Sequence, residues 1–60
     1  MDLILEFEQE TDGRWIAEIP ELPGVLAYGM TRMQAGEKAT ALALASVPML
    51  DRWKIRELSP

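Results

Sequence analysis

Five carboxylates within the first 21 residues are the side chains best suited by type and spacing to do chemistry: Asp2, Glu6, Glu8, Glu18 and Glu21. A two-metal nuclease needs several carboxylates that converge on one point. Glu6 and Glu8 share a face of one expected strand and Glu18 lies on the next, so a carboxylate cluster is conceivable. Acidic residues on the solvent face of a hairpin are the commoner explanation, and we predict no metal site.

Other kinds of catalytic site lack their components. The 60 residues include neither His nor Cys, so a Ser or Thr nucleophile has no ordinary base to activate it, and acyl-transfer triads are excluded. The usual zinc ligands are missing for the same reason. No glycine pattern that cradles phosphate is present either. We therefore predict a protein without catalytic residues, metal or cofactor, which is not an enzyme.

Charge constrains the partner. Ten acidic and six basic residues leave a net charge of −4 at pH 7, which disfavours unassisted nucleic-acid binding and favours a basic partner. Near the carboxyl end, Arg52, Lys54 and Arg56 alternate with Trp53 and Ile55. Such a segment could touch nucleic acid through charge and stacking. It is more often an edge strand guarded by basic side chains, and we expect no direct DNA binding.

Chain length predicts one domain of marginal stability, because a chain of 60 residues buries only about 60% of its unfolded surface. Neither disulfides nor zinc can supplement this core, so we expect a homo-oligomer, a dimer or a tetramer. No apolar run reaches the ~20 residues needed to cross a bilayer, and no signal peptide is evident. We therefore expect a cytoplasmic protein that does not bind membranes.

Alternating residues predict an amino-terminal hairpin. In residues 2–9, Leu3, Leu5 and Phe7 share one face. Residues 10–13 form an acidic reversal that ends in glycine, where the chain can take a left-handed conformation. In the second strand, Trp15, Ala17 and Ile19 share a face. The predicted core is drawn from both strands and consists of Leu3, Leu5, Phe7, Trp15 and Ile19.

A stiff corner connects the second strand to the third. Pro20 and Pro23 lock their own φ and remove backbone donors, and Gly24 can adopt a positive φ, so these three residues predict a structural turn. The third strand is expected over residues 25–30. Both of its faces carry apolar groups, which indicates that a partner covers one of them. Tyr28 is suited to a wet boundary.

A helix is predicted after Thr31, which is a good N-cap and forms a capping box with Gln34. Residues at helical spacing are expected to pack on the sheet: Ala35, Ala39, Leu42, Ser46 and Met49. Beyond Thr40 the helix is apolar nearly all round. We therefore predict an oligomer interface formed by Leu44, Val47 and Met49.

Pro48 should end or kink this helix. The residues after it fit either a further helical turn or a strand, and we predict a helical turn through about Arg52 and a short fourth strand over residues 53–58. The element order β-β-β-α-β predicts a two-layer α+β domain with the helix on one sheet face. A right-handed crossover would place the fourth strand parallel to the first, with a sheet order of third, second, first, fourth.

Residues 12–25, Asp-Gly-Arg-Trp-Ile-Ala-Glu-Ile-Pro-Glu-Leu-Pro-Gly-Val, resemble the HicB-like antitoxin family, as do Gly29-Met30-Thr31 and the alanine-rich helix that follows. The resemblance covers about half of the chain. It implies a truncated RNase H-like fold of three antiparallel strands, a helix and a fourth strand. It also implies that the chain binds and silences a small basic ribonuclease toxin of the HicA type. The expected partner-binding residues are Trp15, Glu18, Glu21, Leu22 and Tyr28.

The chain departs from the family pattern in several places. Val25 replaces a frequent cysteine, Met30 replaces an acidic residue, and residues 33–35 are Met-Gln-Ala where Glu-Glu-Ala is common. Many members carry a carboxy-terminal DNA-binding domain, for which these 60 residues leave no room. An alternative function remains, that of a nucleic-acid-associated or vestigial RNase H-like nuclease with no toxin partner. The acidic charge and the missing histidine count against it.

Overall fold

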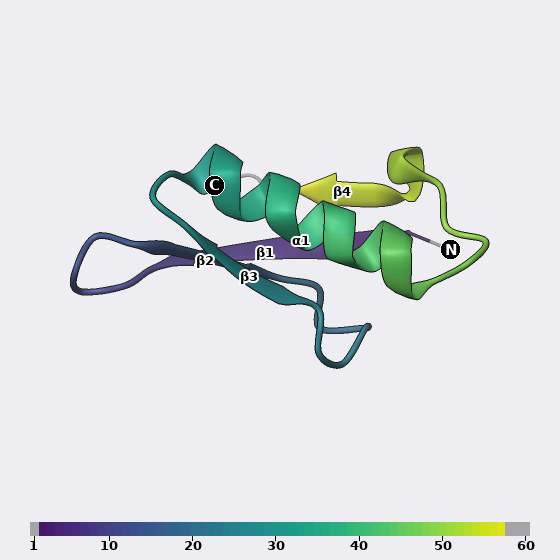
Figure 1. Ribbon diagram of the computed structural model, residues 1–60, viewed down its shortest axis with the longest axis horizontal. Helices are drawn as coiled ribbons and strands as arrows, with labels where there is room; N and C mark the ends of the chain where they lie inside the picture. Colours follow the sequence, from purple (N-terminus) through teal and green to yellow (C-terminus); the bar gives the residue numbers. More distant parts are fainter. Residues whose placement is uncertain (1, 58–60) are drawn as a thin grey trace.

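The computed structural model describes residues 2–57 and shows a two-layer α+β domain, with one long helix lying across a four-stranded sheet (Figure 1). The elements in chain order are β1 (Leu3–Gln9), β2 (Trp15–Glu18), β3 (Leu26–Gly29), α1 (Arg32–Ser46), the 3-10 helix η1 (Arg52–Lys54) and β4 (Ile55–Glu57). The predicted α+β class and β-β-β-α-β order are confirmed.

The sheet has the strand order β3-β2-β1-β4, as predicted. β1, β2 and β3 are successive antiparallel neighbours, whereas β4 returns after the helix and pairs with β1 in parallel. The sheet is therefore mixed rather than a simple meander. This topology leaves β3 and β4 as its two edges.

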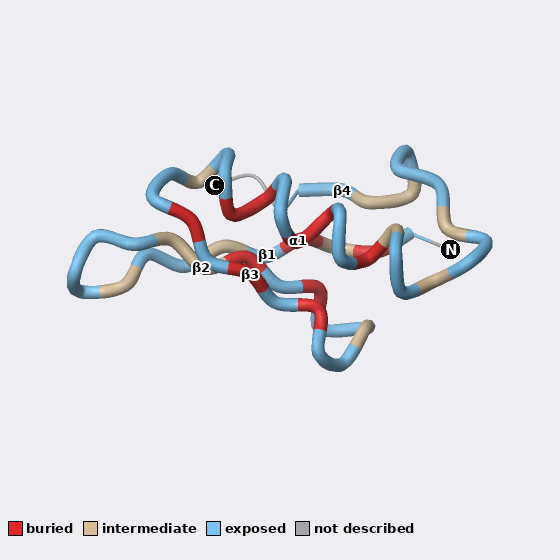
Figure 2. The backbone as a smooth tube through the Cα atoms, in the orientation of Figure 1, coloured by how far each residue is buried: buried red, intermediate tan, exposed pale blue. Residues whose placement is uncertain are grey.

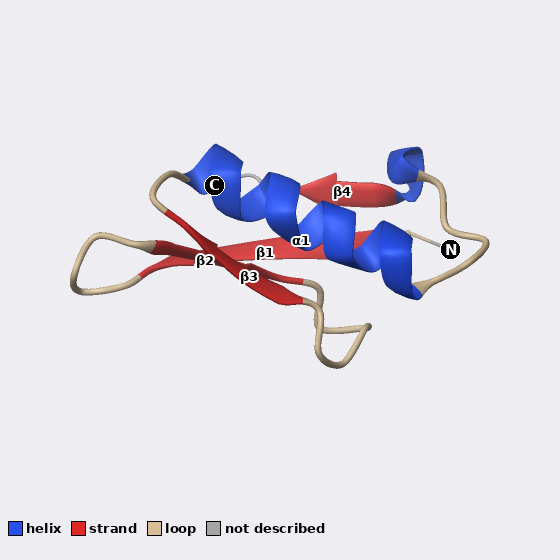
Figure 3. Ribbon diagram, viewed as in Figure 1, coloured by secondary structure: helices blue, strands red, loops and turns tan. Residues whose placement is uncertain are grey.

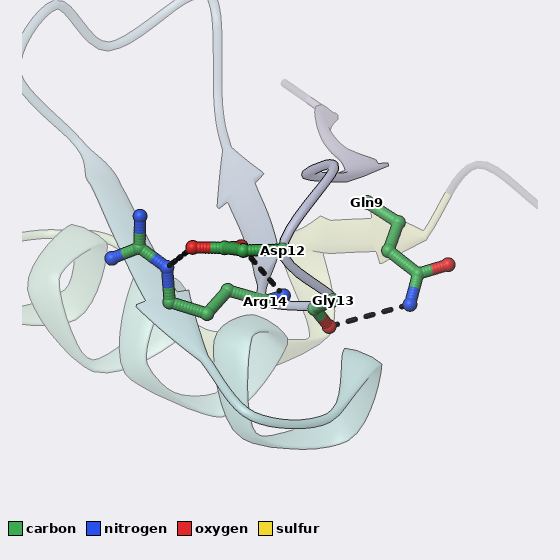
Figure 4. Close-up of polar contacts among 4 residues, drawn as sticks. All are labelled: Gln9, Asp12, Gly13 and Arg14. Carbon is green, nitrogen blue, oxygen red and sulfur yellow. Dashed lines mark hydrogen bonds and ion pairs between the residues drawn. The ribbon is translucent and has the colours of Figure 1, made fainter.

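Local hydrogen bonds shape the hairpin between β1 and β2 (Figure 4). Gly13 has φ +94° and donates its N–H to the Glu10 carbonyl at 2.9 Å. The Asp12 carboxylate accepts from the Arg14 backbone N–H at 3.1 Å and from Arg14 Nε at 2.9 Å, while Gln9 Nε2 donates to the Gly13 carbonyl at 3.3 Å. The backbone hydrogen bond from Arg14 is the main reason why the pKa of Asp12 lies below its usual 3.8.

Two consecutive tight turns form the corner between β2 and β3. The Ile19 carbonyl accepts from the Leu22 N–H at 2.9 Å, and the Leu22 carbonyl accepts from the Val25 N–H at 3.0 Å. Pro20 and Pro23 therefore occupy the second position of each turn, where a fixed φ near −65° is favourable. Gly24 follows with φ +89°, as the third position of a type II turn requires.

Thr31 caps α1 as predicted, since its hydroxyl accepts from the Gln34 N–H at 3.0 Å. The Gln34 side chain reaches one residue further back than in a standard capping box, because its Oε1 accepts from the Met30 N–H at 2.9 Å. The helix ends at Ser46, and the Val47 N–H still donates to the Ala43 carbonyl at 3.0 Å. Pro48 has no N–H with which to continue this ladder.

The predicted helical turn through Arg52 is wrong. After Pro48 the chain reverses in a turn, in which the Leu50 N–H donates to the Val47 carbonyl at 3.1 Å and Leu50 packs against the core. A helical turn forms only later, as η1, and β4 begins at Ile55 rather than Trp53. The proline ends the helix, and the half-buried Leu50 packs against the core after the reversal. The predicted strand end at Leu58 lies outside the described residues.

Leu3, Leu5 and Ile19 form the core as predicted, together with Ala17, Val25 and Ala27 from the sheet and with Ala35, Ala39 and Ala43 from the helix. Phe7 and Trp15 are only half-buried and pack at the margin of this core. Figure 2 shows buried positions along β1, β2, β3 and the helix, whereas the hairpin tip is mostly exposed.

The buried stripe of α1 differs from the predicted one. Ala43 is buried in place of Leu42, which is 42% exposed, and Ser46 and Met49 are also exposed. The residues that α1 buries recur at intervals of three and four, and Leu42 lies at the flank of this stripe. A Cβ on Gly29 would lie 2.6 Å from the backbone nitrogen of Ala35, so the first turn of the helix leaves no room for a side chain at Gly29.

Candidate protein-binding face

The sheet face that α1 leaves uncovered is the candidate site, and we call it the open face (Figure 3). Side chains alternate between the two faces of a strand, so the neighbours of the buried residues point to this side. The residues of the open face come from β1, β2 and β3 and are Ile4, Glu6, Glu8, Ile16, Glu18, Leu26 and Tyr28.

Three carboxylates lie at the centre of the open face. Glu6 is directly opposite Glu18 in the antiparallel register, and Glu8 is opposite Ile16. Together with Phe7 these residues line a shallow hollow of about 200 Å³. Within residues 2–57, none of the three glutamates forms an ion pair. Residues 2–57 contain no group of three or more Asp, Glu, His or Cys residues placed to hold a metal ion.

Apolar side chains surround the carboxylates. Ile4 and Ile16 are half-buried, while Leu26 and Tyr28 are 41% and 40% exposed. Two arginines at the margins are already engaged: the Arg14 guanidinium lies 5.0 Å from the Tyr28 ring centroid and pairs with Asp12, and Arg56 Nε lies 3.4 Å from an Asp2 carboxylate oxygen. The centre of the face is therefore both apolar and negatively charged.

The predicted partner-binding residues do not all lie together. Glu18 and Tyr28 are on the open face, and Glu21 is exposed on the adjacent corner. Trp15 lies on the opposite, helix-covered face, and both Trp15 and Leu22 pack against the core. Five further residues of the open face were not predicted to bind a partner. They follow the same alternation in the sequence that predicted the core, and they are Ile4, Glu6, Glu8, Ile16 and Leu26.

The residues predicted for an oligomer interface are also divided. Leu44 and Val47 are half-buried, whereas Met49 is 84% exposed in the turn after Pro48. The exposed leucine of the helix is Leu42.

A second surface, the α1–β4 groove, has a volume of about 470 Å³. Leu5, Gly36, Thr40 and Ile55 line it together with the charged or flexible side chains of Arg32, Met33, Glu37, Arg52 and Glu57. Arg32 pairs with Glu57 at 3.1 Å, and its guanidinium lies 3.9 Å from the Phe7 ring centroid. The charged groups of the α1–β4 groove are thus paired to a greater extent than the three glutamates of the open face.

Comparison of the chain with models of known protein families, with curated proteins and with solved structures finds no match. The HicB-like resemblance therefore stays a prediction. Among the residues that the structure describes, no helix has the length and apolar character needed to cross a membrane.

Proposed function

We propose that the chain is a non-enzymatic protein-binding module that covers a small basic protein with its open face. Its resemblance to HicB-like antitoxins identifies the candidate partner as a ribonuclease toxin of the HicA type, and the domain as a truncated RNase H-like fold. The observation that carries the proposal is the group of unpaired carboxylates Glu6, Glu8 and Glu18, set among exposed apolar side chains.

The two kinds of side chain have different tasks in such an interface. A chain with a net charge of −4 attracts a basic protein and speeds encounter, mainly through long-range charge. Apolar anchors that become fully buried supply most of the lasting affinity. Ile16, Leu26 and Tyr28 are adjacent to the carboxylates and suit this second task.

The opposed pair Glu6 and Glu18 supports the same assignment. Like charges directly opposite one another in an antiparallel pair destabilise a sheet. A lysine or arginine of a partner placed between the two carboxylates would convert this repulsion into attraction. The pair is thus unfavourable in the isolated chain and favourable in a complex with a basic protein.

The test is affinity capture from the source cells with the tagged 60-residue chain, in parallel with the double variant Glu6→Gln/Glu18→Gln. We expect the wild-type chain to recover a small basic protein that cleaves RNA when it is purified alone, and addition of the chain to stop that cleavage. The double variant should recover much less of it. The control Glu37→Gln/Asp51→Asn removes the same charge away from the open face and should bind like the wild type.

The proposal is overturned if no basic protein is recovered, or if the double variant and its control bind equally well. RNA cleavage by the isolated chain with magnesium would instead favour the nuclease alternative.

A further inference from the structure

The two edges of the sheet differ in how well they are protected from pairing with another chain. An edge strand exposes unpaired N–H and C=O groups, and proteins guard such edges with charged residues or proline. β4 contains Arg56 and Glu57 and follows Lys54, whereas β3, Leu26–Gly29, contains only Leu, Ala, Tyr and Gly. β3 is therefore the unguarded edge.

The direction of the free backbone groups follows from one hydrogen bond. The Ile19 N–H donates to the Val25 carbonyl at 3.1 Å, so these two residues form a hydrogen-bonded pair between β2 and β3. Hydrogen-bonded and non-hydrogen-bonded pairs alternate along antiparallel strands. The backbone groups of Ala27 and Gly29 thus point toward β2, and those of Leu26 and Tyr28 point outward.

Exposed apolar side chains gather at this same edge. Leu26 and Tyr28 are about two-fifths exposed on the open face, and Met30 is 72% exposed just beyond the strand. On the helix, Met33, Gly36, Glu37 and Thr40 line the groove toward β4. Leu42 lies on the opposite flank, three residues after Ala39 and seven after Ala35, and therefore on the side of β3.

We propose that β3 pairs antiparallel with β3 of a second copy of this chain, about a two-fold axis at Ala27. This register places Leu26 opposite Tyr28 of the partner subunit, so that their outward backbone groups form two hydrogen-bonded pairs related by symmetry. The result is one eight-stranded sheet with both open faces on the same side. The two α1 helices, each packed over β3 and β2, lie side by side with Leu42 between them.

The uncharged edge suits a second copy as the occupant, although each chain carries a net charge of −4. β3 carries no charge, so pairing brings no like charges together at the edge itself. The carboxylates of the open face are on β1 and β2, and the two β2 strands would be about 14 Å apart across three strand spacings. This exceeds the Debye length of about 8 Å in physiological salt, so the two acidic faces repel only weakly.

The proposed interface between two β3 strands differs from the oligomer interface that the sequence predicted at Leu44. That residue follows Thr40 by four positions and Glu37 by seven, which places it on the same flank of α1 as the groove and away from Leu42.

The experiment is sedimentation of four purified chains: the wild type, Leu26→Pro, Leu26→Ala and Leu44→Glu. Proline at this position removes an outward N–H without breaking the ladder to β2, whereas alanine removes the same side chain but keeps the N–H. We expect a dimer for the wild type, a weaker dimer for Leu26→Ala, and a monomer with a native circular dichroism spectrum for Leu26→Pro. Leu44→Glu should remain dimeric.

Amide hydrogen exchange keeps the test decisive if Leu26→Pro fails to fold. In the wild type, the amides of Leu26 and Tyr28 should exchange slowly at high protein concentration and rapidly on dilution. A monomeric wild type, rapid exchange of both amides in the dimer, or a Leu26→Pro dimer would each overturn the proposal. Slow exchange that appears only when another protein is added would assign the edge to that protein instead. None of these outcomes depends on the toxin partner.

Discussion

The helix-covered face of the sheet and the open face are built from the same strands, but their side chains differ in kind. The covered face buries Leu3, Leu5 and Ile19 completely or nearly so, under a helix that approaches through alanine and glycine. The open face carries half-buried isoleucines between unpaired glutamates. One face therefore supplies most of the folding free energy, and the other leaves apolar and charged groups free for recognition.

The largest expected difference is between neighbouring residues of β1 on the two faces. Leu3→Ala should lower the free energy of unfolding by about 3 kcal/mol, because a fully buried leucine leaves a cavity. Ile4→Ala removes a half-buried side chain on the open face and should cost about 1 kcal/mol. Urea denaturation of both variants measures the difference. Equal losses would mean that the open face is part of the core.

Gly29→Ala tests the close approach of the two layers. The added Cβ would lie 2.6 Å from the backbone nitrogen of Ala35, which cannot move without displacing the helix, so we expect a loss of about 2 kcal/mol. Gly36→Ala is the control at the same interface. Its Cβ would lie 3.1 Å from the Phe7 ring, which is half-buried and able to shift, and alanine favours the helix. Thermal unfolding should place Gly36→Ala within about 1 kcal/mol of the wild type.

Glu6→Gln tests the repulsion between Glu6 and Glu18 in the isolated chain. Removing one of two opposed carboxylates should raise the free energy of unfolding by about 0.5 kcal/mol. Glu8→Gln, which is opposite Ile16, should leave it unchanged. Urea titrations at low salt would show the difference best, because salt screens exposed charges. A loss of stability in Glu6→Gln would contradict the view that this pair is unfavourable in the isolated chain.

The smallest expected effect is the contribution of Asp12 to the pH dependence of the free energy of unfolding. Its pKa is lower in the folded chain than its usual 3.8, so the folded state favours the ionised carboxylate. This contribution is present above pH 3.8 and is lost as the pH falls through the lower, folded pKa. The stability difference between the wild type and Asp12→Asn should therefore shrink below pH 3.8. A difference that grows in acid would contradict the hydrogen bonds drawn in Figure 4.

Much of the fold could be predicted from the sequence, because local chemistry and overall topology agree. Alternation in β1 placed Leu3 and Leu5 in the core, Thr31 marked the start of the helix, and Pro48 marked the position where it would end or kink. The buried stripe of α1 was harder to predict. Hydrophobicity favours Leu42 over Ala43, but the buried stripe runs through Ala35, Ala39 and Ala43, and Leu42 lies at its flank.

The candidate site was only partly predictable. Glu18 and Tyr28 could be assigned to an exposed surface by strand alternation, whereas Trp15 was assigned both to the core and to a partner. The reason is that a half-buried aromatic residue at the margin of a small core satisfies either interpretation in the sequence. The register of β2 against β3 distinguishes the two interpretations of Trp15, because it places Trp15 opposite Gly29 under the helix.

The four isoleucines allow a direct test of the division between the two faces. Ile4 and Ile16 lie on the open face, whereas Ile19 is in the core and Ile55 lines the α1–β4 groove. The measurement is a titration of chain labelled at the isoleucine δ1 methyl groups with the captured basic protein, followed by NMR. We predict that the Ile4 and Ile16 signals shift and that those of Ile19 and Ile55 stay in place. A shift of Ile55 with Ile4 and Ile16 unmoved would contradict it and place the partner in the groove.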